Sequence, residues 1–329
     1  MPLITTTQGR QFSATEGESL LDAALRADVA LSYSCRTGRC SSCKGKIREG
    51  ETRLLHEETG LSPAEREEGW VLTCSRQAVS EVLLEVEDLG VPLIPARTLP
   101  CRIQSLERLS ADVLRVELRL PPNSRFNYRA GQYIDVIGPG GVRRSYSVAN
   151  APVEGRPLEL HIRQVPGGAM SQYWFEQARP NDLLRLHGPL GTFFLRDVAD
   201  RDLVFLATGT GLAPVKAMLE SLSEADAPRP RSVTVYWGGR VPADLYWESS
   251  ALAVPHRFVP VLSRADADWH GRRGHVQAVM LADSTALDQS VVYACGSDLM
   301  IRDAHAQLVA AGLPEQRFHS DAFVCSSAA

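Results

Sequence analysis

The spacing of hydrophobic residues changes along the chain, and the changes separate regions with different folds. Residues 3–14 and 81–87 alternate as short strands do, whereas residues 20–28 have the spacing of a helix. Strands with one main helix predict a small α+β domain over residues 1–90. A proline-containing stretch without periodicity follows, and we interpret residues 91–100 as a linker.

Two polar pairs mark helix starts in this first region. Ser19 with Asp22 has the spacing of an N-terminal cap at the head of the main helix. Ser62 with Glu65, and Pro63 between them, has the composition of a second cap and first turn. We therefore expect a short second helix that begins after Ser62.

The remainder of the chain contains two further patterns. Residues 101–199 hold short strand-like runs divided by turn residues, which predicts an antiparallel β-barrel. Residues 200–329 alternate continuously apolar strands with helical segments, which predicts an α/β domain with a doubly wound parallel sheet. The sequence thus predicts a multidomain protein with three folded regions.

Composition excludes several classes of protein. The 329 residues are 44% hydrophobic and 22% charged, as in ordinary globular proteins, and the net charge of −4 argues against a nucleic-acid binder. No apolar stretch approaches about 18 residues, so we expect no membrane span. The start of the chain lacks the layout of a signal peptide, and its seven cysteines therefore indicate metal ligands and free thiols in the cytoplasm. Neither Cys101 nor Cys325 has evident chemistry.

Four cysteines form the clearest motif. Cys35, Cys40 and Cys43 are spaced C-x4-C-x2-C, and Cys74 follows alone, which is the plant-type ferredoxin spacing for a [2Fe–2S] cluster. Gly38 and its small neighbours leave room for backbone N–H groups to turn towards sulfur. A zinc site is the main alternative, although structural zinc usually takes its cysteines in two close pairs. Unrelated buried thiols are the third interpretation.

The cysteine run at residues 32–47 resembles the ferredoxin module of NADH-dependent flavin-containing reductases. Three further stretches resemble the ferredoxin–NADP reductase superfamily: RRSYSVANAP at 143–152, GTGLAP at 209–214 and YACGS at 293–297. The resemblance covers essentially the whole chain, in the order ferredoxin domain, FAD-binding barrel, NAD-binding domain. Within the superfamily the chain is similar to the CDP-6-deoxy-3,4-glucoseen reductases and to the reductase components of Rieske-type and other multicomponent oxygenases.

The resemblance implies a set of flavin contacts in the barrel. Arg144 would pair with the FAD pyrophosphate, which suits a guanidinium that binds phosphate through two N–H groups. Tyr146 would pack on the isoalloxazine and Ser147 would lie near the flavin N5. Without the resemblance, the run RSYS at residues 144–147 would be interpreted as an edge strand. The glycine pair Gly167-Gly168 would likewise be interpreted as a plain turn. The other residues implied for FAD are Ser145, His161, Ile162, Arg163, Gly168, Ala169, Met170, Ser171 and Phe323.

The resemblance also implies an NAD site at the ends of the parallel strands. Gly209 and Gly211 would let the backbone approach the dinucleotide, and Cys295 would approach the nicotinamide, unless it is simply a small buried residue. Asp244 would repel the 2′-phosphate of NADPH whereas Arg240 would attract it, and we expect NADH to be preferred. The other residues implied for this site are Thr208, Thr210, Pro214, Trp237, Gly238 and Gly296. Catalytic contacts are thus expected from Tyr146, Ser147 and Cys295.

The implied mechanism passes a hydride from NADH to FAD and then single electrons through the cluster to a partner protein. The partner is expected to be a PMP-dependent sugar dehydrase, and the alternative is a terminal oxygenase. A non-catalytic iron–sulfur carrier is a hypothesis of another class. A basic rim beside the cluster could dock the partner, or its charges could be simply solvated or tune the cluster; it comprises Arg36, Arg39, Lys44, Lys46 and Arg48.

Overall fold

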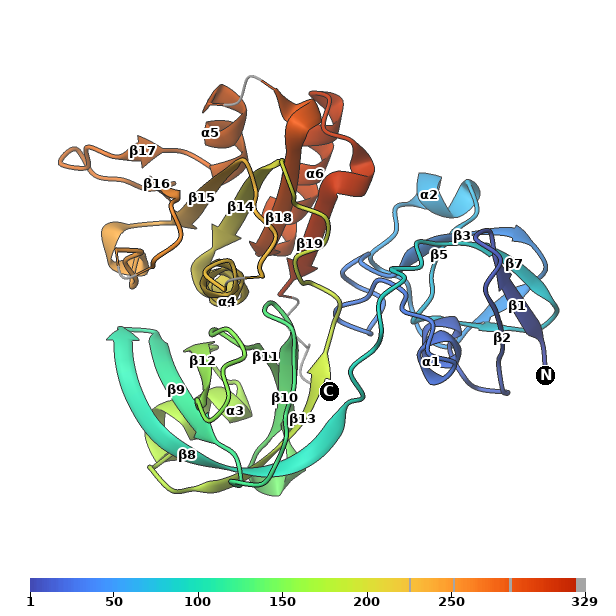
Figure 1. Cartoon of the computed structure of the whole chain (residues 1–329), viewed down its shortest axis with the longest axis horizontal. Coiled ribbons are helices and arrows are strands. Elements are labelled where there is room, and N and C mark those ends of the chain that lie inside the picture. Colours follow the sequence, from blue (N-terminus) through green and yellow to red (C-terminus); the bar gives the residue numbers. More distant parts are fainter. Residues whose placement is uncertain (225, 251, 284–285, 324–329) are drawn as a thin grey trace. The chain divides into compact units, whose positions relative to one another are not determined.

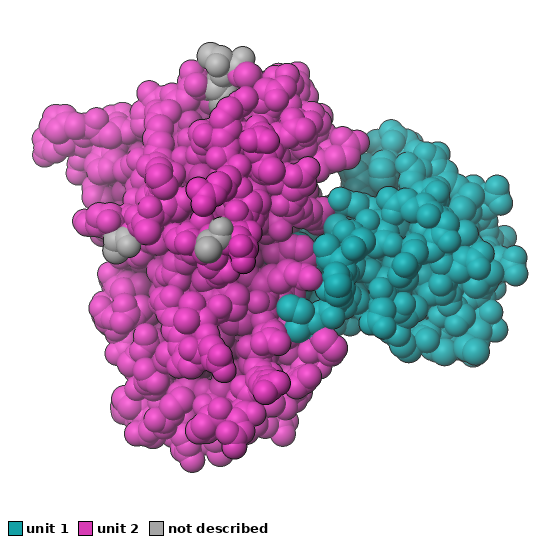
Figure 2. All heavy atoms as spheres, in the orientation of Figure 1, with its two compact units in different colours: residues 1–94, 191–193 teal, residues 95–190, 194–329 magenta. Residues whose placement is uncertain are grey.

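The structure is a computed structural model that describes residues 1–224, 226–250, 252–283 and 286–323. These residues form two compact units (Figure 2), one comprising residues 1–94 with 191–193, and the other residues 95–190 with the rest of the chain. Cys325 lies outside the described residues. Among the residues described, no helix is long and apolar enough to cross a membrane.

The first unit is a mixed sheet with two short helices, as the sequence predicts for its N-terminal domain (Figure 1). Its main sheet has the order β2-β1-β7-β3-β5, and β4 pairs with β6. The elements are β1 Leu3–Thr6, β2 Gln11–Ser13, α1 Leu20–Arg26, β3 Lys44–Glu49, β4 Thr52–Leu54, α2 Pro63–Glu67, β5 Trp70–Leu72, β6 Arg76–Ala78 and β7 Val82–Glu85.

Both predicted helix caps are confirmed. The Ser19 hydroxyl accepts a hydrogen bond from the Asp22 N–H at 3.0 Å, and α1 buries Leu20 and Leu21 in the core of the unit. Ser62 and Glu65 form a reciprocal capping box at the head of α2. These two starts are therefore determined by local hydrogen bonds.

Residues 191–193 belong to the first unit because they pair with the segment just before the cluster loop. The Tyr33 N–H donates to Thr192 Oγ1 at 2.7 Å, and the Thr192 N–H donates to the Tyr33 carbonyl at 3.1 Å. The Thr192 hydroxyl also donates to the Tyr33 carbonyl at 3.0 Å, so Tyr33 is held by Thr192 two residues before Cys35.

The second unit begins with the predicted barrel. Its sheet has the order β11-β10-β13-β8-β9-β12, and the outer strands meet at one bridge between Val148 and Leu160. All pairs along this sheet are antiparallel. The elements are β8 Arg97–Ser110, β9 Val113–Arg119, β10 Tyr133–Ile137, β11 Arg143–Ser147, β12 Leu158–Arg163, α3 Ala169–Gln172 and β13 Leu183–Leu190, with a π-helical turn at Tyr173–Gln177 after α3.

The first barrel strand starts earlier than the sequence indicates. Strand β8 begins at Arg97, inside the stretch interpreted as a linker, and Pro100 pairs in register with Arg185. Over residues 97–101 β8 is paired only with β13, because its pairing with β9 begins at Arg102. Proline is accepted on such an edge, where its missing N–H removes no ladder bond.

The rest of the second unit is a parallel sheet in the order β17-β16-β15-β14-β18-β19, as predicted. Strands β14 and β18 at its centre are almost wholly buried, and α4, α5 and α6 pack against the sheet. The elements are β14 Asp202–Thr208, α4 Leu212–Ser221, β15 Ser232–Gly239, β16 Arg257–Leu262, β17 Arg272–Arg273, α5 Val276–Asp283, β18 Ser290–Gly296, α6 Asp298–Ala310 and β19 Phe318–Ala322.

Candidate functional site

The cysteine loop turns its backbone N–H groups towards sulfur. Arg36, Gly38 and Ser41 have positive φ, so the loop winds tightly. The Thr37 N–H donates to Cys35 Sγ and the Cys35 N–H donates to Cys40 Sγ, each at 3.4 Å. Such bonds stabilise negative charge on sulfur, which a thiolate ligand requires.

Gly38 is required for close packing as well as for its backbone conformation. A Cβ at this position would lie 2.8 Å from Ser75 Oγ and closer still to the Glu57 carbonyl oxygen. The Gly60 N–H also donates to the Gly38 carbonyl at 2.8 Å. The cluster loop thus packs closely against residues 57–60 and against Ser75.

The four thiols meet as two pairs, Cys35 with Cys40 and Cys43 with Cys74. A hydrogen bond from the Cys40 thiol, aided by the loop N–H groups, lowers the pKa of Cys35 to about 5. A hydrogen bond from the Cys43 thiol lowers the pKa of Cys74 to about 7. In each pair, one cysteine therefore loses its proton more readily and forms a thiolate.

The pairing of the thiols bears on the choice between a two-iron cluster and a zinc site. A [2Fe–2S] cluster needs two thiolates at each of its two irons, and zinc needs four ligands around one ion. The thiol arrangement fits the cluster.

A buried ion pair that the sequence analysis missed supports the segment around Cys74. The Glu58 side chain is 3% exposed and lies 2.8 Å from Arg76 Nη2. It also accepts the Leu72 N–H at 2.7 Å. Glu58 therefore holds the residues two positions before and two positions after the fourth cysteine, and a glutamate in a loop carries no periodic signal that could have revealed this.

The predicted flavin strand β11 lies on an open seam of the barrel. One edge of β11 pairs with β10, whereas the other meets β12 only at the Val148–Leu160 bridge. Arg144 is half-buried on this strand, and its Nη1 donates to the Arg143 carbonyl at 2.8 Å. Within the described residues it has no carboxylate partner, so its charge is available for a phosphate.

The neighbouring side chains on β11 are fixed by protein contacts. Tyr146 Oη accepts a hydrogen bond from Trp174 Nε1 at 3.0 Å, and burial raises the pKa of this tyrosine to about 12. The Ser145 hydroxyl donates to Asp135 at 2.6 Å, whereas Ser147 is buried at the end of the strand. Tyr146 is therefore neutral and held in one orientation.

The predicted second phosphate loop forms a short helical turn. Gly168 is the N-cap of α3, which contains Ala169, Met170 and Ser171. The Ser171 hydroxyl accepts the Val165 N–H at 2.8 Å and so closes the loop. Met170 is buried beside Gly138.

The residues assigned from the end of β12 separate into two groups. Ile162 is buried in the barrel core, and both ring nitrogens of His161 contact protein groups, Glu159 and Tyr246. Arg163 points elsewhere: its guanidinium is 3.0 Å from Asp112, and its Nη1 lies 3.0 Å from where a Gly209 Cβ would stand. Its side chain therefore lies beside the dinucleotide loop.

The GTG loop packs tightly against the end of β18. A Cβ on Gly211 would lie 2.6 Å from the Cys295 carbonyl carbon and 2.8 Å from the Gly296 nitrogen. Gly296 has a φ of 124° and packs against Thr208, whose hydroxyl accepts the Ser297 N–H at 3.0 Å. The two loops thus form one unit at the carboxyl ends of parallel strands, where such sheets bind ligands.

Several residues assigned to the dinucleotide are core residues of this edge. Trp237 is fully buried, and its Nε1 donates to the Gly209 carbonyl at 3.0 Å. Cys295 is fully buried, and burial raises its pKa well above the ordinary value. Thr210 and Pro214 are buried at the start of α4, and Gly238 lies against Val276.

Phe323 ends the described chain beside the same loops. Its N–H donates to the Gly296 carbonyl at 2.8 Å, and its side chain is exposed. The predicted role of Phe323 over the flavin remains a prediction.

Arg240 and Asp244 form a close pair after β15. Asp244 Oδ2 accepts the Arg240 N–H at 2.7 Å and Arg240 Nε at 3.0 Å. Partial burial acts to raise the pKa of Asp244, but the hydrogen bonds from Arg240 outweigh it and lower that pKa. The carboxylate is therefore ionised and oriented.

The basic rim is largely paired with acids. Arg36 contacts Asp22, Lys44 contacts Glu65 at 2.6 Å, and Arg48 contacts Glu85. Lys46 Nζ and Lys44 Nζ lie 5.4 and 4.3 Å from the centre of the Trp70 ring. The positive field of the rim is thus weaker than the sequence suggests.

Comparison with known families matches each region in turn. Residues 4–79 match the 2Fe-2S iron-sulfur cluster binding domain, residues 100–195 the oxidoreductase FAD-binding domain, and residues 205–306 the oxidoreductase NAD-binding domain.

Several known proteins are similar to this chain over nearly their full length. The CDP-6-deoxy-L-threo-D-glycero-4-hexulose-3-dehydrase reductase of Yersinia pestis is 40% identical over 96% of each chain. The reductase component of propane 2-monooxygenase from Mycolicibacterium smegmatis is 31% identical over 95% of this chain and 94% of its own. The crystal structure of an Amycolatopsis cytochrome P450 reductase superposes with a TM-score of 0.79 at 30% identity, covering 99% of this chain and all of the other.

The residues present fit all three cofactors: two thiol pairs for the cluster, an arginine without a carboxylate partner on an open strand for flavin phosphate, and a close-packed glycine loop for a dinucleotide, all within the described residues. When bound, the nicotinamide and flavin exchange a hydride and the cluster carries single electrons. The chain belongs to the iron–sulfur flavoprotein reductases of the ferredoxin–NADP reductase superfamily, and it is a nicotinamide-dependent oxidoreductase that passes electrons to a protein partner.

Proposed function

We propose that the electron acceptor is a PMP-dependent sugar dehydrase that acts on a CDP-linked deoxyhexulose. The observation that supports this choice is the 40% identity to the Yersinia dehydrase reductase over nearly the full length of both chains. The propane monooxygenase reductase is 31% identical over a similar length, so an oxygenase is the second candidate.

A coupling experiment separates the two acceptors. The purified protein is supplied with NADH and either the dehydrase with its CDP-sugar or a terminal oxygenase with its substrate. We expect NADH consumption to match deoxysugar formation in the first mixture only. Coupling with the oxygenase alone would contradict the proposal. The Cys40→Ser variant is the control, because it should reduce its flavin without delivering electrons through the cluster.

The preferred dinucleotide is proposed to be NADH. Asp244 is ionised and held by three hydrogen bonds from Arg240, which supports a role for its carboxylate as an acceptor for a ribose 2′-hydroxyl. A 2′-phosphate would meet that carboxylate, while the guanidinium is already engaged. Asp244→Asn should therefore narrow the difference in kcat/KM between NADH and NADPH. Equal efficiency with both dinucleotides in the unaltered protein would refute the assignment.

The roles of individual residues at the flavin remain proposals. Arg144 would hold the pyrophosphate, Tyr146 would contact the ring, and Ser147 would lie near its reactive nitrogen. Full burial of Cys295 supports its alternative interpretation as a core residue, so any approach to the nicotinamide would need a shift of the adjoining loop. A cytoplasmic location is proposed from the cysteine usage alone.

We also propose that the partner docks at the basic rim. The rim residues that are paired with acids would contribute less to docking than the others. Arg36, Lys44 and Arg48 each contact an acid, so reversing them would break local ion pairs as well as any docking contact. Lys46→Glu is therefore the better test, because the printed contact of the Lys46 ammonium is with the Trp70 ring and not with an acid. We expect slower, less salt-dependent delivery to the partner and unchanged flavin reduction.

The control is Arg10→Glu, which makes the same type of charge change elsewhere in the first unit. Arg10 is outside the rim and lies 3.6 Å from Asp88, so this variant also controls for the loss of an ion pair. If this control slows delivery as much as the rim variant, net charge and not a docking site would be responsible.

A further inference from the structure

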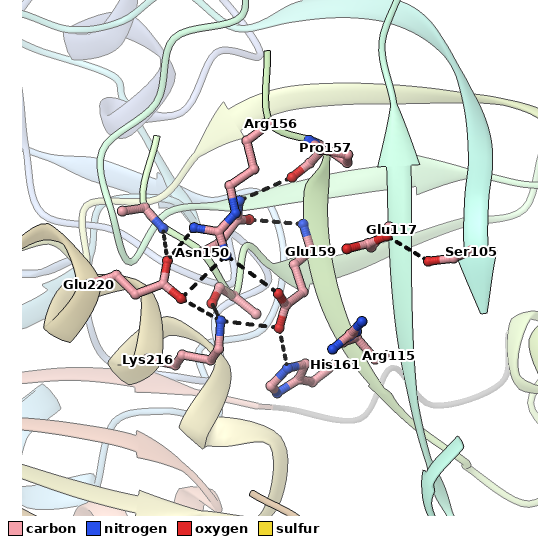
Figure 3. Close-up of polar contacts among 12 residues, drawn as sticks. Ser105, Arg115, Glu117, Asn150, Arg156, Pro157, Glu159, His161, Lys216 and Glu220 are labelled. Atoms are coloured by element: carbon pink, nitrogen blue, oxygen red, sulfur yellow. Dashed lines mark hydrogen bonds and ion pairs between the residues drawn. The ribbon is translucent and has the colours of Figure 1, made fainter. Parts of the chain in front are cut away.

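A group of charged side chains in the second unit connects the flavin strand with the dinucleotide loop. This charge network consists of Arg156, Glu159, His161, Lys216 and Glu220 (Figure 3); Glu159, His161 and Lys216 are buried, Glu220 is half-buried and Arg156 is exposed. Glu159 and His161 come from barrel strand β12, and Lys216 and Glu220 come from helix α4. The network therefore joins the barrel to the NAD-binding sheet within one unit.

Lys216 is the centre of the network. The residue is 8% exposed, and its Nζ lies 3.0 Å from the Ala149 carbonyl, 2.7 Å from Glu220 Oε1 and 3.2 Å from Glu159 Oε1. An ammonium group has three donors, so these three acceptors account for all of them. Its direction is consequently fixed.

The barrel side is ordered by one histidine tautomer. His161 Nε2 lies 2.8 Å from Glu159 Oε1, and a carboxylate only accepts, so Nε2 carries the proton. Burial lowers the pKa of His161, and the neutral ring can then accept the Tyr246 hydroxyl at Nδ1, 3.2 Å away. Each group in this chain of bonds has one role.

The chain continues to the dinucleotide loop. The Tyr246 ring packs edge-on against Trp237 with centroids 5.1 Å apart, and Trp237 Nε1 donates to the Gly209 carbonyl at 3.0 Å. At its other end, Lys216 holds Ala149, which follows the flavin strand just after the Val148–Leu160 bridge. A continuous set of contacts thus runs from the flavin strand to the GTG loop.

Glu220 provides a second attachment to the same part of the barrel. Its Oε2 accepts the Ala151 N–H at 3.0 Å and Arg156 Nη1 at 2.8 Å. Because α4 starts directly after the GTG loop, a helix held by Lys216 and Glu220 cannot turn or slide without moving that loop.

We propose that Lys216 is a positioning residue for hydride transfer: by anchoring α4 to Ala149 and Glu159, it sets where the GTG loop lies relative to the flavin strand. Buried ion pairs add little net stability compared with apolar residues of similar size, but they require one geometry. Hydride transfer depends on such geometry, since a misplacement of about 1 Å can cost about a hundredfold in rate. This inference rests on the hydride step of the family and not on the partner proposed above.

The test compares Lys216→Met with Arg231→Met. Arg231 pairs with Asp202 at the opposite end of β14, so the control removes a paired cation from the same sheet far along the strand from the GTG loop. Stopped-flow reduction of the flavin at saturating NADH should slow by about tenfold or more in Lys216→Met. The Kd for NADH, the FAD content and flavin-to-cluster transfer should stay close to those of the unaltered protein, and Arg231→Met should match it throughout.

Hydrogen exchange supplies a measurement that needs no turnover. We expect faster exchange in residues 205–222 and in β12 of Lys216→Met, and no change there in Arg231→Met. Because this arm is independent of dinucleotide and partner, it tests the anchor even if those assignments fail. A hydride rate within twofold of normal, or equal loss of FAD and hydride transfer, would overturn the positioning role.

A second variant covers the case in which Lys216→Met does not fold. Lys216→Met with Glu220→Gln removes one charge of each sign, so the network keeps its charge balance, and Arg156 remains as a cation 3.9 Å from Glu159. The amide that Glu220→Gln introduces is neutral, and its oxygen can still accept the Ala151 N–H. This double variant should fold, bind FAD and show the same slow hydride step; normal hydride transfer in it would refute the proposal.

Discussion

Gly211 is the position where a single methyl group should test the dinucleotide site most directly. A Cβ there would stand 2.6 Å from the Cys295 carbonyl carbon and 2.8 Å from the Gly296 nitrogen. Both distances are well below the separation of about 3.5 Å at which nonbonded carbon atoms rest. The neighbours are backbone atoms at the end of a buried strand, so they cannot rotate away as a flexible side chain would.

The overlap predicts the size of the effect. Forcing one methyl group into a close-packed site costs roughly 1–3 kcal/mol, and a shift of the GTG loop by about 1 Å can slow a transfer step about a hundredfold. In Gly211→Ala we therefore expect stopped-flow reduction of the flavin by NADH to fall by about two orders of magnitude. FAD and iron content should be unchanged, because the atoms nearest this methyl group belong to Cys295 and Gly296 at the end of β18.

Gly312→Ala is the matched control. Gly312 has a φ of 104°, and a Cβ there would meet nothing within 4 Å. It should cost about 1–2 kcal/mol of stability through backbone strain and leave the kinetics normal. Normal flavin reduction in Gly211→Ala would show that the close approach of the two loops is unimportant, and equal slowing in Gly312→Ala would show that the effect is one of general stability.

Three further outcomes are expected. Cys40→Ser should lose the cluster yet keep FAD and flavin reduction by NADH, since the two units are separately compact. Iron and flavin contents of the purified variant test this, and loss of FAD together with iron would contradict it. Arg144→Ala should keep its iron but lose FAD on dialysis, and full retention would exclude Arg144 as the phosphate anchor. Burial lowers the pKa of His319 to about 3, so the folded ring stays neutral while the unfolded chain gains a proton below its ordinary pKa. Stability should thus fall by up to about 2 kcal/mol from pH 6.5 to 5, and His319→Phe should lose this slope in urea unfolding; an unchanged slope would contradict it.

Elements set by local interactions were predictable from the sequence. The caps at Ser19 and Ser62 need only residues three positions away, and both are present. The apolar strands β14 and β18 are buried on both faces, so their composition alone indicates a parallel sheet covered by helices. The four cysteines were similarly defined by spacing, and their thiols meet in two pairs.

Short strands were not predictable in the same way. Strand β3 contains Lys44 and Lys46, and β4, β5 and β6 have three residues each. Runs of this length with charged residues show no periodicity, and they are strands only because the first unit supplies pairing partners. The ion pairs of the basic rim were missed for the same reason, since the acids that form them come from distant positions in the sequence.

Lys216 left a signal that could have been recognised. It stands four residues after Leu212 and three before Leu219, which are both fully buried, so helical spacing places it on the apolar face of α4. A lysine there must find buried acceptors, and Glu220 follows four residues later. The sequence does not reveal which barrel residues complete the network around Lys216. Glu159 and His161 face outward from β12, and they are buried only by the neighbouring part of the unit.

The assigned site residues therefore fall into two structural groups. Arg144, Arg163 and Asp244 present charged groups that are not buried in the core, so they can contact a cofactor directly. Ile162, Trp237 and Cys295 are at most 1% exposed, and Trp237 supports the Gly209 carbonyl instead of offering its ring. Motif matching cannot separate these groups, because a residue that touches the cofactor and a residue that holds the loop occur in the same run. Substitutions in the first group should lower affinity for the cofactor, whereas those in the second should slow transfer at a nearly unchanged affinity.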